Sequence, residues 1–170
     1  MSDTRWTLAW DERPAEEARN LNPAFCTELI ARTVVEYHKA RKSPLSVATA
    51  FLVVPLTLHK PTRTALPGRA NTAFATWIAT NNPLLAELPG RVNRLRPVSR
   101  EALLFSIRYG LNALKDGGLV PGAKPIKLTA RPATTTDDVN EARAAAALLG
   151  RWFGAQTSER AILQGFGVAP

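Results

Sequence analysis

The chain has little of the chemistry that supports disulfide bonding or metal binding. It contains one cysteine, Cys26, and two histidines, His38 and His59, which stand far apart in the sequence. A single cysteine cannot form an intrachain disulfide, and isolated ligand residues do not provide the cluster that a metal site requires. We therefore expect neither a disulfide nor a metal centre.

Motifs of nucleotide hydrolysis and of nucleophilic catalysis are also missing. No segment matches the GxxxxGK[ST] phosphate loop or the GxSxG nucleophile elbow. Acid–base catalysis needs a carboxylate or a histidine placed in a pocket, and the central half of the chain has only Glu87, Glu101 and Asp116. We expect a protein that is not an enzyme, with no catalytic residue, no cofactor and no small-molecule substrate.

Long hydrophobic runs are absent. The longest largely apolar stretch, residues 47–58, is too short to cross a bilayer and contains Pro55. The first residues include acids and lack the apolar core of a secretory signal. These features predict a cytoplasmic protein without a membrane partner.

The residues that are present fit one globular domain. Of the 170 residues, 45% are hydrophobic and 21% are charged, so the chain can bury a sizeable core. We expect an N-terminal arm over residues 1–21 and a single helical domain over residues 22–170.

The positive charge is concentrated in the middle of the chain. Residues 42–131 hold thirteen Lys/Arg and three Asp/Glu, a balance of +10, whereas the two flanking segments each balance to −1, giving the net charge of +8. One interpretation is a general solubility charge. The other is that the middle segment faces a polyanion or an acidic partner surface.

Helical patterns dominate the remaining sequence. Asn22 and Pro23 mark a helix start, and apolar residues continue at helical spacing to about residue 40. Ser99 is expected to cap another helix over residues 99–114, and Thr136 to cap the last long one. The further helices are expected at residues 43–58 (kinked or ended near Val54), 62–66, 71–81, 83–95 (with Pro89 and Gly90 breaking it) and 158–164.

One β-hairpin is expected after these helices. Residues 119–120 and 126–129 have strand character and flank a Pro-Gly pair at 121–122. A hairpin that directly follows helices is the order of a winged helix-turn-helix. The predicted fold class is therefore mainly α, a compact helical domain with a small β-hairpin, winged-helix-like.

The candidate binding residues are basic and fall into three groups. Each residue could contact phosphates or an acidic partner, or could solvate the surface or pair with Glu28 and Glu36. The groups are His59, Lys60 and Arg63; Arg91, Arg94, Arg96 and Arg100; and, on the expected wing, Lys124 and Lys127.

Three segments together resemble a known family. Asn22-Pro23-Ala24-Phe25, then FLVVPLTLHKPTR from Phe51, then GRWF and a terminal ILQGFGVAP are similar to the middle component of three-component ABC ATPase systems. The Lamassu-type anti-phage systems belong to the same broad group. The resemblance extends from about Leu21 to Pro170.

The resemblance implies a non-enzymatic bridging subunit of a prokaryotic defence complex. Its partners would be an SMC-like ABC ATPase and an effector, often a nuclease, and DNA is a further candidate contact. The alternative from the residues alone is a free-standing winged-helix DNA-binding regulator.

Overall fold

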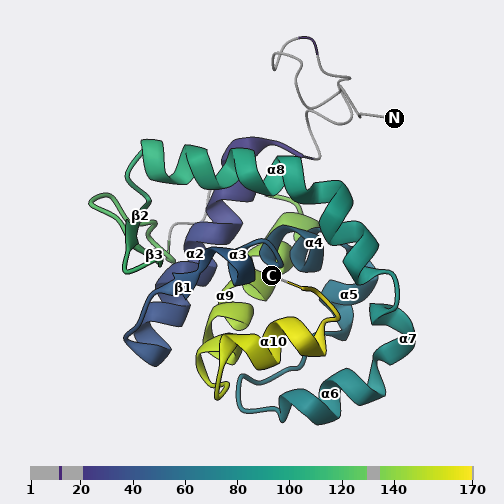
Figure 1. Cartoon of the computed structure of the whole chain (residues 1–170). Helices are drawn as coiled ribbons and strands as arrows, with labels where there is room; N and C mark the ends of the chain where they lie inside the picture. The colour runs from purple at the N-terminus through teal and green to yellow at the C-terminus, as the bar shows by residue number, and fades with distance from the viewer. Residues whose placement is uncertain (1–11, 13–20, 130–134, 170) are drawn as a thin grey trace.

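The computed structural model describes Glu12 and residues 21–129 and 135–169. Within these residues the protein is mainly helical, with one small three-stranded sheet at one side (Figure 1). The expected N-terminal arm lies outside the described residues, apart from Glu12 and Leu21. No helix in the described segments is long and apolar enough to cross a membrane.

The central helix is α2, Pro23–Arg41, and it begins where the sequence indicates. The side-chain oxygen of Asn22 accepts hydrogen bonds from the backbone N–H groups of Ala24 and Phe25, at 2.8 and 3.4 Å. At the other end Lys42 adopts a left-handed conformation, with φ of 60°, and ends the helix. Most of α2 is buried, because other elements pack around it.

The closest neighbour of α2 is α9, Asp137–Gly154, and a glycine lets the two helices approach. A Cβ atom on Gly150 would lie 2.4 Å from the carbonyl oxygen of Thr33. The Thr33 hydroxyl, itself buried, lies 3.0 Å from the carbonyl oxygens of both Leu29 and Ala146. This close contact between α2 and α9, which we call the seam, lies in the middle of the core. As predicted, Thr136 caps α9 by accepting from the N–H of Val139.

Shorter helices surround this pair. One of them is α10, Glu159–Gly165, and its N-cap is Ser158, whose hydroxyl accepts from the N–H of Ala161. An aromatic cluster of Phe74, Trp77, Trp152 and Phe166 joins α6, α9 and the C-terminal end of α10. The shorter helices are α3 (Val47–Ala50), α4 (Val53–Leu58), α5 (Lys60–Ala65), α6 (Phe74–Thr80), α7 (Asn82–Leu85) and α10 (Glu159–Gly165).

The sheet contains three short antiparallel strands. They are β1 (Leu45–Ser46), β2 (Asn112–Lys115) and β3 (Gly118–Pro121), in the order β1-β3-β2. Leu45 pairs with Leu119, and Leu114 pairs with Leu119 from the other side. The sheet therefore joins a segment near the start of the chain to a hairpin far along it.

The predicted break near Pro89 and Gly90 and the predicted cap at Ser99 are both wrong. A single helix, α8, runs from Leu88 to Arg108. Pro89 lies in its first turn, where a missing N–H costs nothing. Pro97 lies inside it and removes one helix hydrogen bond, and the helix bends visibly along its length (Figure 1). Ser99 is a buried interior residue.

The predicted hairpin is shifted along the chain. Its strands are β2 and β3, and the turn between them is Asp116-Gly117, with φ of 50° and 77°. Positive φ at both positions is what a two-residue hairpin turn demands, and Asp-Gly supplies it. Gly117 therefore belongs to the hairpin turn and Gly118 to β3, and residues 126–129 are not a strand.

The expected buried helix over residues 43–58 is divided. It comprises β1, α3 and α4, and the break falls at Phe51 and Leu52 instead of near Val54. Pro55 is tolerated because it lies in the first turn of α4, where its N–H would have no helical partner.

Candidate functional site

The first predicted basic group is largely structural. Only about 7% of Arg63 is exposed. Its Nη1 donates to the carbonyl of Thr57 at 2.9 Å, and its Nη2 donates to Asp138 and Glu141 at 2.7 and 3.3 Å. Lys60, which is exposed, also pairs with Asp138 at 3.1 Å. These ion pairs join α5 to the first turn of α9.

His59 and Arg91 also have internal roles. His59 is the N-cap of α5, and its Nδ1 accepts from the N–H of Thr62. Burial, followed by the nearby charge of Arg91, lowers the pKa of His59. Arg91 is buried and donates to the hydroxyl of Thr62 at 3.1 Å. Burial likewise lowers the pKa of Arg91.

The acids predicted as alternative partners of the arginines of residues 91–100 pair elsewhere. Glu28 accepts from Arg143 and from Arg32, and Glu36 accepts from Lys39 and Arg151. Burial alone would raise the pKa of Glu28, but the hydrogen bonds from Arg143 and Arg32 outweigh it and lower that pKa. These carboxylates stabilise the packing of α2 on α9.

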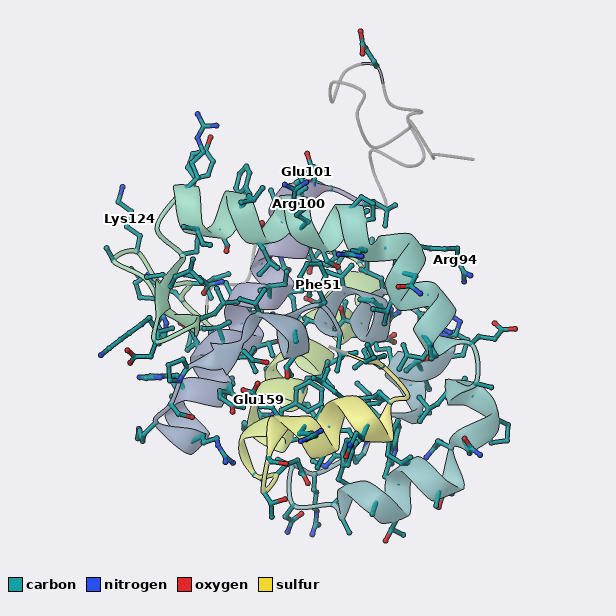
Figure 2. The ribbon with its side chains drawn as sticks, viewed as in Figure 1. Phe51, Arg94, Arg100, Glu101, Lys124 and Glu159 are labelled. Carbon is teal, nitrogen blue, oxygen red and sulfur yellow. The ribbon has the colours of Figure 1, made fainter. Side chains whose placement is uncertain are left out.

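The outward arc of α8 carries the remaining candidates of the second group. Arg94, Arg96 and Arg100 are exposed, and no ion pair within the described part of the chain involves any of them. Figure 2 shows Arg94 and Arg100 on this helix, which forms one outer edge of the molecule. Arg108 lies farther along the same arc and is also exposed. Sequence reasoning missed Arg108, which a continuous helix through Pro97 would have placed about 80° around the helix axis from Arg100.

Lys124 and Lys127 are exposed, but they lie on the segment after β3 and not on the hairpin. The backbone N–H of Lys124 donates to the carbonyl of Gly110 at 2.8 Å. Lys124 therefore sits just past the C-terminal end of α8, on the side where Figure 2 labels it. The structure thus brings Lys124 to the end of the arginine row, and the basic residue on the hairpin itself is Lys115.

Three large apolar side chains are exposed at the same end of the molecule. Leu104 is 58% exposed, Tyr109 52% and Leu114 60%. Tyr109 stacks on Phe105 with ring centroids 4.3 Å apart, and Arg108 lies 6.0 Å from the Tyr109 centroid. Leu114 lies on β2 and not on the helix predicted over residues 99–114, because α8 ends at Arg108.

A groove of about 390 Å³ lies beside α8. Phe51 lines it, between α8 and α10 in Figure 2. Most of its lining is apolar, and Arg96 and Asn93 are its polar members. Across the described residues, no group of three or more His, Cys, Asp or Glu side chains is placed to hold a metal ion.

Comparison with known proteins gives one match. No curated protein and no solved structure matches the chain. The family model of the ABC-three component (ABC-3C) system Middle Component 3 matches residues 10–170. The match begins ahead of Leu21 and confirms the predicted resemblance to a middle component. The chain therefore belongs to the Middle Component 3 family of ABC-three component systems.

Proposed function

We propose that this chain is a non-catalytic adaptor subunit of a prokaryotic anti-phage defence complex of the Lamassu-like kind. In this proposal it links an SMC-like ABC ATPase to an effector of nuclease type and works in the cytoplasm. The observation that carries the proposal is the family match, which spans residues 10–170. A middle component of a multi-component system needs surfaces for its partners, and the chain offers one at the C-terminal end of α8.

That surface has the composition of a protein interface. Leu104 and Tyr109 expose large apolar side chains beside Arg108. Tyrosine and arginine are enriched where proteins contact one another, and exposed apolar side chains that gather in one place mark interaction sites. The proposed occupant is the ATPase subunit, since the cations around these side chains favour an acidic partner surface.

The absence of a catalytic role is part of the proposal. Asp138 and Glu141, which lie close together, are both bound to Arg63. That use of the two acids supports a structural role for them. A reproducible enzymatic activity of the purified chain, abolished by a single substitution, would contradict this part of the proposal.

The test is co-expression with the products of the neighbouring genes, followed by a pull-down through a tag on this chain. We expect the ATPase to be recovered, and failure to recover it would count heavily against the proposal. Leu104→Ser combined with Tyr109→Ser should reduce recovery. Ala86→Ser combined with Ala144→Ser, which alters exposed positions on other elements, should leave recovery unchanged.

A free-standing winged-helix DNA-binding regulator is the second candidate. One observation favours it: the hairpin β2–β3 follows α8 directly, and β1 completes a sheet beside it. Under this alternative the chain would bind DNA in a gel shift and co-purify with no ATPase. Recovery of a stable complex with the ATPase would therefore favour the adaptor subunit over the free-standing regulator.

A further inference from the structure

Four exposed cations lie along α8 and just past its C-terminal end, and we call them the cationic ridge: Arg96, Arg100, Arg108 and Lys124. We propose that the cationic ridge binds the phosphate backbone of duplex DNA. This goes beyond the adaptor role, which requires only protein contacts.

The spacing of the ridge suits an extended polyanion. Arg96, Arg100 and Arg108 are four and eight residues apart on the exposed arc of one helix. At a rise of about 1.5 Å per residue, Arg96 and Arg108 are at most about 18 Å apart along the helix. Duplex DNA presents a phosphate charge about every 1.7 Å of its axis, so the row can lie along roughly five base pairs. Lys124 continues the row past the end of the helix.

The ridge keeps its charge because the nearby acids are few. α8 contains five arginines and one glutamate, Glu101. Four of the carboxylates on the other elements, Glu28, Glu36, Asp138 and Glu141, are engaged in ion pairs within α2, α5 and α9. Positive potential therefore concentrates on the one outer edge that α8 forms (Figure 2).

The same features favour duplex DNA over other polyanions. Single-stranded nucleic acid is usually held by a series of stacking aromatic side chains. Tyr109 is the exposed aromatic residue of the described segments, and it already packs on Phe105. The major groove of B-form DNA is about as wide as an α-helix with its side chains. The deep, narrow major groove of A-form RNA does not admit a helix.

The proposal is tested by fluorescence anisotropy with a labelled mixed-sequence DNA duplex of about two helical turns. Titrations are made between ~50 and ~200 mM salt. With four phosphate contacts, the logarithm of the binding constant should fall against the logarithm of salt with a slope of about −4. Affinity should then drop by roughly two orders of magnitude across the series.

A pair of charge-matched variants locates the binding. Arg96→Gln with Arg100→Gln, two positions outside the proposed ATPase interface, should make the slope shallower by roughly 2, because two phosphate contacts are lost. Arg69→Gln with Arg160→Gln removes the same charge from exposed positions next to α6 and on α10, two elements that lie away from the C-terminal half of α8 in Figure 1. These control substitutions should leave the slope unchanged. Thermal melting of both variants checks that each is folded.

Several results would overturn the proposal. The first two are no DNA binding at the lowest salt and a DNA affinity that does not change with salt. The others are an equal loss of DNA affinity in the ridge variant and the control variant, and an affinity for single-stranded DNA or duplex RNA equal to that for duplex DNA. If the ridge variant keeps its DNA affinity but loses the ATPase in the pull-down, the ridge is a protein interface. Loss of DNA affinity with normal recovery of the ATPase supports the ridge and leaves the adaptor role intact, so the two proposals can fail separately.

Discussion

Arg63 Nη2 lies 2.7 Å from Oδ1 of Asp138, and this ion pair joins α5 to the start of α9. The arginine is buried, whereas the aspartate side chain is 58% exposed. The sequence predicted Arg63 as a contact with an external partner. The structure instead makes its guanidinium an internal link, because Thr57, Asp138 and Glu141 all accept from it.

The first prediction concerns this link. Arg63→Met should lower the free energy of unfolding by about 2–3 kcal/mol, because charge-assisted hydrogen bonds to Thr57, Asp138 and Glu141 are lost. Asp138→Asn should have a much smaller effect, since its carboxylate faces water and Arg63 keeps Glu141. Urea denaturation of both variants measures the difference. Equal stability of Arg63→Met and the unchanged chain would show that the link contributes nothing.

The second prediction is a pH dependence at Glu28. Hydrogen bonds from Arg143 and Arg32 hold the pKa of Glu28 below its ordinary value in spite of burial. The carboxylate therefore stabilises the fold above its unfolded-state pKa of about 4.3, and this contribution is lost as pH falls through the lower folded-state pKa. Glu28→Gln should be less stable than the unchanged chain at pH 7, by about 2 kcal/mol.

The check is denaturation at a series of pH values. The gap between Glu28→Gln and the unchanged chain should narrow as the solution is acidified below about pH 4. A gap that is the same in acid and at neutral pH would show that the charge of Glu28 is not the cause.

The third prediction concerns the seam between α2 and α9. Alanine is the better helix former, yet Gly150→Ala should destabilise the protein by about 2–3 kcal/mol because the new methyl group would overlap the Thr33 carbonyl. Ala144→Gly, at an exposed position on the same helix, should cost only about 1 kcal/mol through helix propensity. Thermal or urea melting distinguishes them. A stabilising Gly150→Ala would mean that the helices can separate without loss.

The fourth prediction compares two adjacent leucines. Leu103→Ala should cost about 2–5 kcal/mol, since Leu103 is a buried core side chain. Leu104→Ala should change stability by less than about 0.5 kcal/mol, since its side chain is mostly exposed. In the pull-down with folded protein, Leu104→Ala should reduce recovery of the ATPase more than Leu103→Ala does. Normal recovery would remove Leu104 from the proposed interface.

Local signals in the sequence predicted two helix starts. Asn22 and Thr136 are N-caps as expected, because a short oxygen-bearing side chain can accept from the first free N–H groups of a helix. Ser99 was misread because its helix began eleven residues earlier and accommodated Pro97. Long-range packing overrode the local signal there.

Exposure was harder to predict than secondary structure. Nothing in the local sequence separates Arg63 and Arg91, which are buried, from Arg96 and Arg100, which are exposed. The distinction depends on Asp138, Glu141 and Thr62, which reach these arginines from other elements. The hairpin was misplaced for a different reason: the Pro-Gly pair at 121–122 looked like the turn, whereas Asp116-Gly117 makes it.

The two populations of cations have different surroundings, and ionic strength will act on them differently. Arg63 and Arg143 are buried beneath other side chains, so dissolved salt screens their ion pairs poorly. The arginines on the outer edge of α8 are exposed to solvent, so salt screens their interactions strongly. A concentrated salt wash would consequently strip an electrostatically held ligand while the folded body stayed intact. The charges that stabilise the fold and the charges open to a ligand would thus respond separately to salt.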